Sequence, residues 1–331
     1  MFCAFSLTGI VQPAEAAPVV LKFAGQNPPE HFATVSMNEI AKEVAQKTNN
    51  RVQIKVFPAN QLGDYSLVYE ELIRGTVEMA CISFPSQFDN RMDLIYVQGY
   101  TSSYEQVANV YDPNGWFFKK MDEFNSRLGV KLLGMYLEGM VGIGTVKPMK
   151  EPLNPKVDKG LLLRIPNMDV FKTALEGAGF RTISIPFADV YQSMQTGVCD
   201  GDTGYSIVAA YTTFGDVIKH WYNFNKNTEC LGIMISDKVW KKLSAEDRKV
   251  LQQAVSKQAA LSITNAKAND QKYLDLMKKK GIQVHMYTPK ELKPMMDAFA
   301  ATWGQLDQSK GKDLMDEFKK EMKKISDKIA K

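Results

Sequence analysis

The sequence has few of the residues that build common catalytic and metal sites. Its three histidines stand far apart in 331 residues, so no H-x-x-x-H metal-binding pair is present. No G-x-S-x-G nucleophile motif occurs, no G-x-G-x-x-G follows the first predicted strand, and no C-x-x-C is found. We therefore expect neither a metal nor another cofactor. A catalytic dyad assembled only in space would leave no motif, so an exported α/β enzyme acting on organic acids remains the weaker alternative.

Long apolar runs and blocks of one charge are also missing. Beyond the N-terminal region no stretch reaches the roughly 20 apolar residues that a membrane-spanning helix needs. The net charge is +4, and lysine and arginine are spread along the chain, so nothing indicates a nucleic-acid site. Charged residues make up 24% and hydrophobic residues 45%, as in an ordinary globular protein.

The N-terminus predicts a signal peptide over residues 1–17. Residues 2–11 are mostly apolar, and the small residues of Pro13–Ala17 match a cleavage site near Ala16 or Ala17. No lysine or arginine precedes the apolar run, which leaves open a start further upstream. We therefore expect an exported protein.

Cysteine is scarce and leaves two alternatives. Cys3 falls in the leader, so Cys81, Cys199 and Cys230 remain in the mature chain. An oxidising compartment permits a Cys199–Cys230 disulfide. The favoured alternative is three buried thiols that act as small hydrophobic side chains.

The region from Gly160 to Asn225 organises the chain. Short apolar strands alternate there with amphipathic helices, which is typical of a βαβ-type α/β domain. The predicted strands are 161–163, 182–185 and 198–199, and the predicted helices are 169–177 and 188–196. Ligands of such open sheets bind beyond the carboxyl ends of the strands. Arg164 and a predicted turn at Asp202–Tyr205 lie at such ends, so we place the centre of a site there.

The rest of the chain continues the α/β pattern, and its length suits about two domains. Strands are predicted at 19–23, 51–57, 77–83, 130–135, 139–145, 230–236 and 281–286. Helices are predicted at 31–48, 66–74, 105–128 with a break near Pro113, 244–280, from 288 onward, and 310–331.

Several short motifs carry a family resemblance. They are Leu21–Phe23, Phe57–Asp64 (FPANQLGD), Leu163–Asn167 (LRIPN), Pro186–Tyr191 (PFADVY), Met194–Gly197 (MQTG) and Asp200–Gly201. In this order the chain resembles the substrate-binding proteins of tripartite ATP-independent periplasmic (TRAP) transporters, of the DctP type. The resemblance implies a two-lobed periplasmic-binding-protein-like α/β fold, with strands crossing at the hinge and one long helix spanning both lobes.

The resemblance also implies a domain organisation and partners. Lobe 1 is expected to comprise residues 18–138 with 230–270, and lobe 2 residues 139–229 with 271–331. The protein would act in the periplasm as a monomer. It would bind a small organic acid and deliver it to the small and large TRAP membrane subunits, without nucleotide or metal. An exported sensor component with the same binding lobes remains an alternative.

The resemblance places a substrate-binding arginine at Arg164, whose planar guanidinium can grip a carboxylate or sulfonate through paired hydrogen bonds. Val141 stands where many relatives carry a second arginine, which favours a ligand with one strong anionic group over a dicarboxylate. Glu138 and Asp202 are expected to accept hydrogen bonds from ligand hydroxyl or amine groups. The remaining expected substrate-binding residues are Gln26, Asp64, Ser83, Phe84, Asn167, Phe187, Gly204 and Tyr205.

Overall fold

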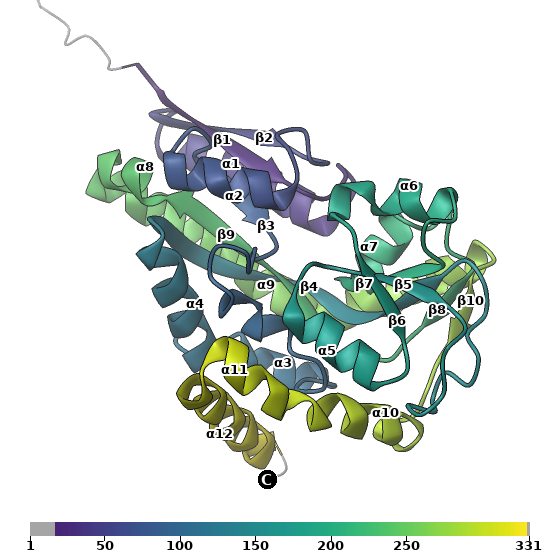
Figure 1. Ribbon diagram of the computed structural model, residues 1–331. Coiled ribbons are helices and arrows are strands. Elements are labelled where there is room, and N and C mark those ends of the chain that lie inside the picture. The colour runs from purple at the N-terminus through teal and green to yellow at the C-terminus, as the bar shows by residue number, and fades with distance from the viewer. Residues whose placement is uncertain (1–16, 330–331) are drawn as a thin grey trace, which may run out of the picture.

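The computed structural model describes residues 17–329, which form an α/β fold around a large mixed sheet (Figure 1). Among these residues ten strands follow the order β2-β1-β3-β9-β4-β7-β5-β6, with β8 joined to β4 and β10 to β8. The strands are β1 (Val19–Gly25), β2 (Val52–Phe57), β3 (Met79–Ile82), β4 (Val130–Thr145), β5 (Leu162–Ile165), β6 (Arg181–Ser184), β7 (Gly201–Ser206), β8 (His220–Tyr222), β9 (Thr228–Ser236) and β10 (Gln283–His285). Residues 1–16, which carry most of the predicted signal peptide, lie outside the described residues.

Helices lie around this sheet and against one another. They are α1 (Phe32–Lys47), α2 (Tyr65–Arg74), α3 (Tyr104–Val110), α4 (Trp116–Arg127), α5 (Asp169–Gly177), α6 (Val190–Gln195), α7 (Ile207–Thr212), α8 (Asp237–Lys242), α9 (Ala245–Lys279), α10 (Pro289–Ala301), α11 (Asp307–Lys310) and α12 (Lys312–Ile329). Short 3₁₀ helices are η1 (Met92–Tyr96), η2 (Phe187–Asp189) and η3 (Trp303–Leu306). The predicted helix at 105–128 is indeed broken near Pro113, between α3 and α4.

Strand β3 shows how helices cover the sheet on two faces. Met79 and Cys81 pack in a cluster with α1 and α9, whereas Ala80 and Ile82 pack in another with α2 and α4. Successive side chains of a strand point to opposite faces, so β3 is buried on both. This explains its continuous apolar sequence, which lacks a polar alternation.

The two halves of the fold are joined by β4 and α9 (Figure 1). Strand β4 pairs with β9 along residues 130–140 and with β7 and β8 along 141–145. Helix α9 has 35 residues and contacts α1 and α3 in one half and α7 and β10 in the other. A Cβ atom at Gly134 would lie 2.9 Å from Cγ1 of Val255, so this glycine lets α9 approach β4 closely. The expected crossing strand and long helix are confirmed, and the two strands predicted at 130–135 and 139–145 are one.

The prediction around β7 was wrong in detail. The predicted strand at 198–199 and the predicted turn at Asp202–Tyr205 are replaced by a strand that begins at Gly201 and ends at Ser206. The sequence pattern did not predict this strand because several of its residues are polar, and most of their side chains find partners inside the protein. Thr203 Oγ1 donates to the carbonyl of Gly142 at 2.7 Å, and the hydroxyl of Ser206 caps α7.

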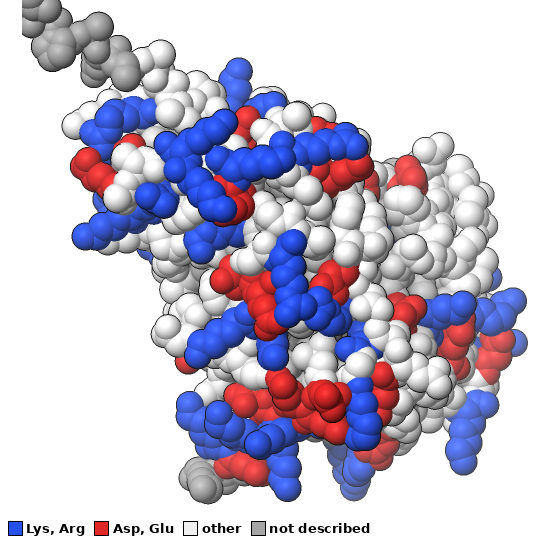
Figure 2. Space-filling view, turned by 60° about the vertical axis from the view of Figure 1, so that its left-hand side comes forward, with Lys and Arg blue, Asp and Glu red and all other residues white. Residues whose placement is uncertain are grey.

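The three described cysteines are free and buried, so the alternative of a Cys199–Cys230 disulfide is wrong and the buried thiols are confirmed. Within residues 17–329 no helix combines the length and apolar character needed to cross a bilayer. The face in Figure 2 carries basic and acidic side chains side by side.

The division into two lobes at the predicted boundaries stays a prediction. Helix α12 packs on α3 and α4, with the ring of Phe318 at 5.9 Å from that of Phe117. The chain thus returns to its first half at its C-terminal end.

Candidate functional site

Arg164 is held rigidly inside β5. Its Nε donates to the carbonyl of Ile185 at 2.8 Å, and its Nη1 lies 3.2 Å from Oδ1 of Asp202 and 3.4 Å from the carbonyl of Thr203. Only 1% of the side chain is exposed. No hydrogen bond joins Nη2 to any described residue. The Nη2 group of a preorganised guanidinium is therefore available for a ligand.

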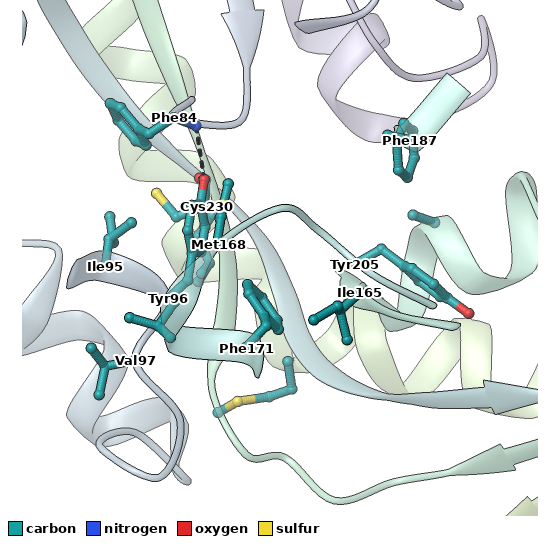
Figure 3. Close-up of a cluster of buried hydrophobic side chains, with 14 of the residues drawn as sticks. Phe84, Ile95, Tyr96, Val97, Ile165, Met168, Phe171, Phe187, Tyr205 and Cys230 are labelled. Carbon is teal, nitrogen blue, oxygen red and sulfur yellow. Dashed lines mark hydrogen bonds between the residues drawn. The ribbon is translucent and has the colours of Figure 1, made fainter. Parts of the chain in front are cut away.

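This guanidinium lines a narrow cavity between the two halves, with an internal volume of about 20 Å³. From the half that contains β1 come Tyr65, Ser83, Tyr96 and Glu229, and from the other half Arg164, Pro166, Met168, Phe171, Phe187 and Gly204. Apolar and aromatic walls with a few polar groups are typical of small-molecule sites. Figure 3 shows Tyr96, Met168 and Phe171 gathered at one side of this region, with Phe187 set apart from them.

Four residues predicted from the sequence line the cavity: Ser83, Arg164, Phe187 and Gly204. Three others stand directly behind its walls. Asp202 holds Arg164. Gln26 donates to Ser83 Oγ at 3.1 Å and accepts from its amide at 2.9 Å. Asp64 Oδ1 caps α2 by accepting from the backbone amide of Ser66. Its Oδ2 accepts from the backbone amide of Ala188 at 3.5 Å, which links the two halves.

The other four predicted residues do not line the cavity. Asn167 is exposed, and Phe84 is buried with its amide donating to the hydroxyl of Tyr96 (Figure 3). The ring of Tyr205 packs at 4.7 Å from that of Phe214, and its hydroxyl points away from Phe171 in Figure 3. Glu138 lies on β4. Whether these residues contact a ligand stays a prediction.

Glu138 belongs to a separate polar cluster. Its carboxyl accepts from the amide of Asn27 and, at 3.3 Å, from the hydroxyl of Ser206. Burial raises the pKa of Glu138 to about 7. His31 lies 3.8 Å away, but burial lowers its pKa to about 3, so the contact is no ion pair at neutral pH.

Sequence reasoning missed Tyr65, Tyr96, Met168, Phe171 and Glu229. The aromatic residues carry no signal that separates a cavity wall from a core. Glu229 did carry one, because it is the single charged residue of the buried strand β9. The same signal, a charge in an apolar strand, identified Arg164.

The charged groups around Arg164 are strongly perturbed. Burial raises the pKa of Asp202 to about 7, although the guanidinium of Arg164 opposes the shift. Burial also lowers the pKa of Lys226 to about 7, and its Nζ donates to Gln98 at 2.6 Å. Clustered groups with shifted pKa values are typical of functional sites.

We predict that the free energy of unfolding falls as the pH rises from about 5 to about 7, because several carboxyls are buried. Burial raises the pKa values of Asp93, Glu138, Asp202 and Asp270 to about 7. Each carboxyl stabilises the fold fully at pH values below its unfolded pKa of about 4. This contribution to the free energy of unfolding is lost as the pH rises through the folded pKa. The lowered pKa values of His31, His220 and His285 act in the opposite direction, but Glu229, whose pKa burial also raises, adds a fifth group to the carboxyl side. Urea midpoints at pH 5 and 7 measure the difference.

Asp270→Asn should reduce this slope, since the amide oxygen can still accept from the amide of Met140 but has no proton to lose. An unfolding free energy that rises across the same pH range would contradict the assignment.

Gly204→Ala should destabilise the fold by about 2 kcal/mol. Gly204 has φ +95°, and a Cβ atom would lie 2.6 Å from Cγ of Pro166. Gly129 is the matched control, because its φ is +78° but no atom lies within 4 Å of the added carbon. Gly129→Ala should cost about 1 kcal/mol, from backbone strain alone. If urea denaturation shows that both variants lose the same free energy of unfolding, the contact with Pro166 is relieved without cost.

The chain is similar to known proteins over most of its length. The family described as "Bacterial extracellular solute-binding protein, family 7" (DctP) matches residues 23–310. The C4-dicarboxylate-binding periplasmic protein DctP of Vibrio cholerae is 26% identical over 90% of this chain and 89% of its own length. The sialic acid-binding periplasmic protein SiaP of the same species is 23% identical over 85% and 86%.

Two crystal structures show the shared fold. The sugar acid binding protein DctPAm of Advenella mimigardefordensis, in complex with galactonate, has a TM-score of 0.85 at 18% identity and covers 93% of this chain and 99% of its own. A TRAP periplasmic solute-binding protein of Shewanella oneidensis with bound succinate has a TM-score of 0.82 at 22% identity, covering 92% and 100%.

Proposed function

The chain belongs to bacterial extracellular solute-binding protein family 7, the DctP family, and we propose that it captures a small organic anion for uptake by a TRAP transporter. The observation that carries this proposal is the geometry of Arg164. Its guanidinium is fixed by Asp202 and Ile185, and its Nη2 has no partner among the described residues. A carboxylate or sulfonate is the group that such a charged N–H donor binds best.

The cavity explains how capture would work. Its walls come from both halves, so an anion bound to Arg164 would also contact Tyr65 and Ser83 across the cleft. The contact between Asp64 and Ala188 closes the cleft at one point. A ligand that binds both halves together favours the closed form by its differential affinity for that form.

The names of the relatives support the ligand class. They include binders of C4-dicarboxylates and of sialic acid, and the two structures hold galactonate and succinate. All of these ligands carry a carboxylate, the group that Arg164 would bind. The proposal extends to the family's setting, with export by the N-terminal leader, a periplasmic location, a monomeric binding protein and TRAP membrane subunits as partners.

A thermal-shift screen of carboxylates and sulfonates tests the proposal. A ligand at about a hundred times its dissociation constant should add about 2.7 kcal/mol of stability. Sugar acids, small 2-oxo acids, cyclic acids and their uncharged methyl esters form the panel. We expect acids to raise the melting temperature and the esters to have no effect. Stabilisation by neutral sugars or esters, with none by any acid, would contradict an anion-binding function.

A further inference from the structure

Glu229 stands in the cavity wall that belongs to the opposite half of the fold from Arg164. It lies near the start of β9, is 3% exposed, and lines the cavity together with Tyr65 and Ser83. The hydroxyl of Ser83 donates to its Oε1 at 2.9 Å, whereas Oε2 receives no hydrogen bond from any described residue. The cavity therefore holds a carboxyl oxygen that is free to bind a ligand.

This carboxyl has no cationic partner. The ion pair of Arg164 is with Asp202, and Lys226 donates to Gln98 and to Asn227 at 3.1 Å. No ion pair to Glu229 is formed by a described residue within the 4.0 Å that defines one. A buried carboxyl is costly to ionise without a cation beside it, so a cation brought by a ligand would stabilise its charged form.

The charges that face Glu229 come from several elements. Glu138 lies on β4, which pairs with β9, and its neighbour Gly139 is the residue opposite Glu229. Lys226 lies just before β9 and also acts on Glu229. Arg164 acts from β5, and the hydroxyls of Tyr65 and Tyr96 also lie near. Burial, reinforced by Glu138, raises the pKa of Glu229 well above its usual value. Burial therefore favours the neutral form of this carboxyl while the cleft is empty.

We propose that the ligand is amphoteric, an organic acid that also carries a protonated amine, with its carboxylate on Arg164 and its ammonium on Glu229. Met168, Phe171 and Phe187 supply apolar parts of the cavity wall, which suit a hydrocarbon body. A protonated amine is the ligand group that would favour the charged form of Glu229, whereas a second carboxylate would add another negative charge beside Glu138 and Glu229. This inference rests on the proposed function and names the substrate class of the same site.

Ligand binding would then move a proton. The neutral carboxyl of Glu229 loses its proton to the solvent as the ammonium arrives, and the bound pair is carboxylate and ammonium. Calorimetric titration of the wild-type protein in two buffers of different ionisation enthalpy should show net proton release. Net proton uptake would contradict the pairing, and this measurement requires no variant.

The decisive experiment uses acids that share one carbon skeleton. The probes are leucine, 2-hydroxy-4-methylpentanoate and 4-methylpentanoate, with β-leucine added to vary the distance between amine and carboxylate. Affinities are measured by calorimetry on the mature chain. We expect at least one amino acid to bind about tenfold or more tightly than its hydroxy and deaminated counterparts.

Two variants test the contacts of the amine and of the carboxylate separately. Glu229→Gln keeps an acceptor for Ser83 and should abolish the preference for the amine, whereas Arg164→Lys should weaken every acid. The inference fails if the deaminated acid binds as tightly as the amino acid. It also fails if Glu229→Gln leaves the ratio of their dissociation constants unchanged while Arg164→Lys weakens both. In either case the proposed function stands. If no acid binds, or Arg164→Lys leaves all affinities intact, both fail.

Discussion

Replacing Arg164 with lysine is expected to weaken organic-acid binding by about tenfold to a hundredfold while the chain still folds. Hydrogen bonds to charged groups contribute about 1.5–3 kcal/mol each, and about 1.4 kcal/mol corresponds to tenfold in affinity. An ammonium keeps the positive charge beside Asp202 but cannot offer a planar second edge to the ligand. Calorimetric titration with an acid found in the thermal-shift screen gives the ratio of dissociation constants.

Arg181 provides the matched control. It lies on the neighbouring strand β6, is 61% exposed, and has its Nε 3.3 Å from Oδ2 of Asp158. Arg181→Lys should leave affinity unchanged, because an exposed ion pair of this kind contributes little and lies outside the cavity. Equal affinity of wild type and Arg164→Lys would remove Arg164 from the site, provided that urea denaturation shows the variant to be folded.

Lys310→Met is expected to lower the free energy of unfolding by about 3–5 kcal/mol. The ammonium of Lys310 is fully buried, 2.8 Å from Oδ1 of Asp93 on η1 and 3.9 Å from Oδ2 of Asp169 on α5. It thereby ties the C-terminal segment to the two elements that carry Tyr96 and Phe171 of the cavity wall. Removing it leaves Asp93 buried without its partner. Urea denaturation of both proteins measures the loss.

The double variant Lys310→Met/Asp93→Leu distinguishes a broken pair from lost packing. Removing both charges abolishes the unpaired carboxyl, so the double variant should recover much of the stability lost in the single one. Burial raises the pKa of Asp93 to about 7, so the single variant should lose less stability in acid than at neutral pH. A double variant less stable than Lys310→Met would show that the pair itself stabilises the fold.

The sequence predicted the hinge better than it predicted the cavity. The glycine-rich stretch of β4 and the capped, uninterrupted pattern of α9 are local signals, and both elements were found. Strand β7 was missed because its sequence, GDTGYS, has no apolar alternation. The side chains of its Asp202, Thr203 and Ser206 hydrogen-bond to β4 and β5, which are distant in the sequence, and no local pattern can show such partners.

The same reason explains which site residues were found. Arg164 was predictable because an arginine within an apolar strand needs an anionic partner. Its partner within the protein, Asp202, was expected near the site but as a ligand acceptor. Glu229 and Tyr96 enter the cavity only because β9 and η1 pack beside Ser83, which is a property of the tertiary fold.

The most direct test of the account is a crystal structure of the protein with an acid that stabilises it. We predict that the ligand lies in the cavity between the two halves, with its acidic group within hydrogen-bonding distance of Arg164 Nη2 and with Asp202 still paired to the guanidinium. An acid bound elsewhere, or bound in the cavity with its charged group turned away from Arg164, would contradict it.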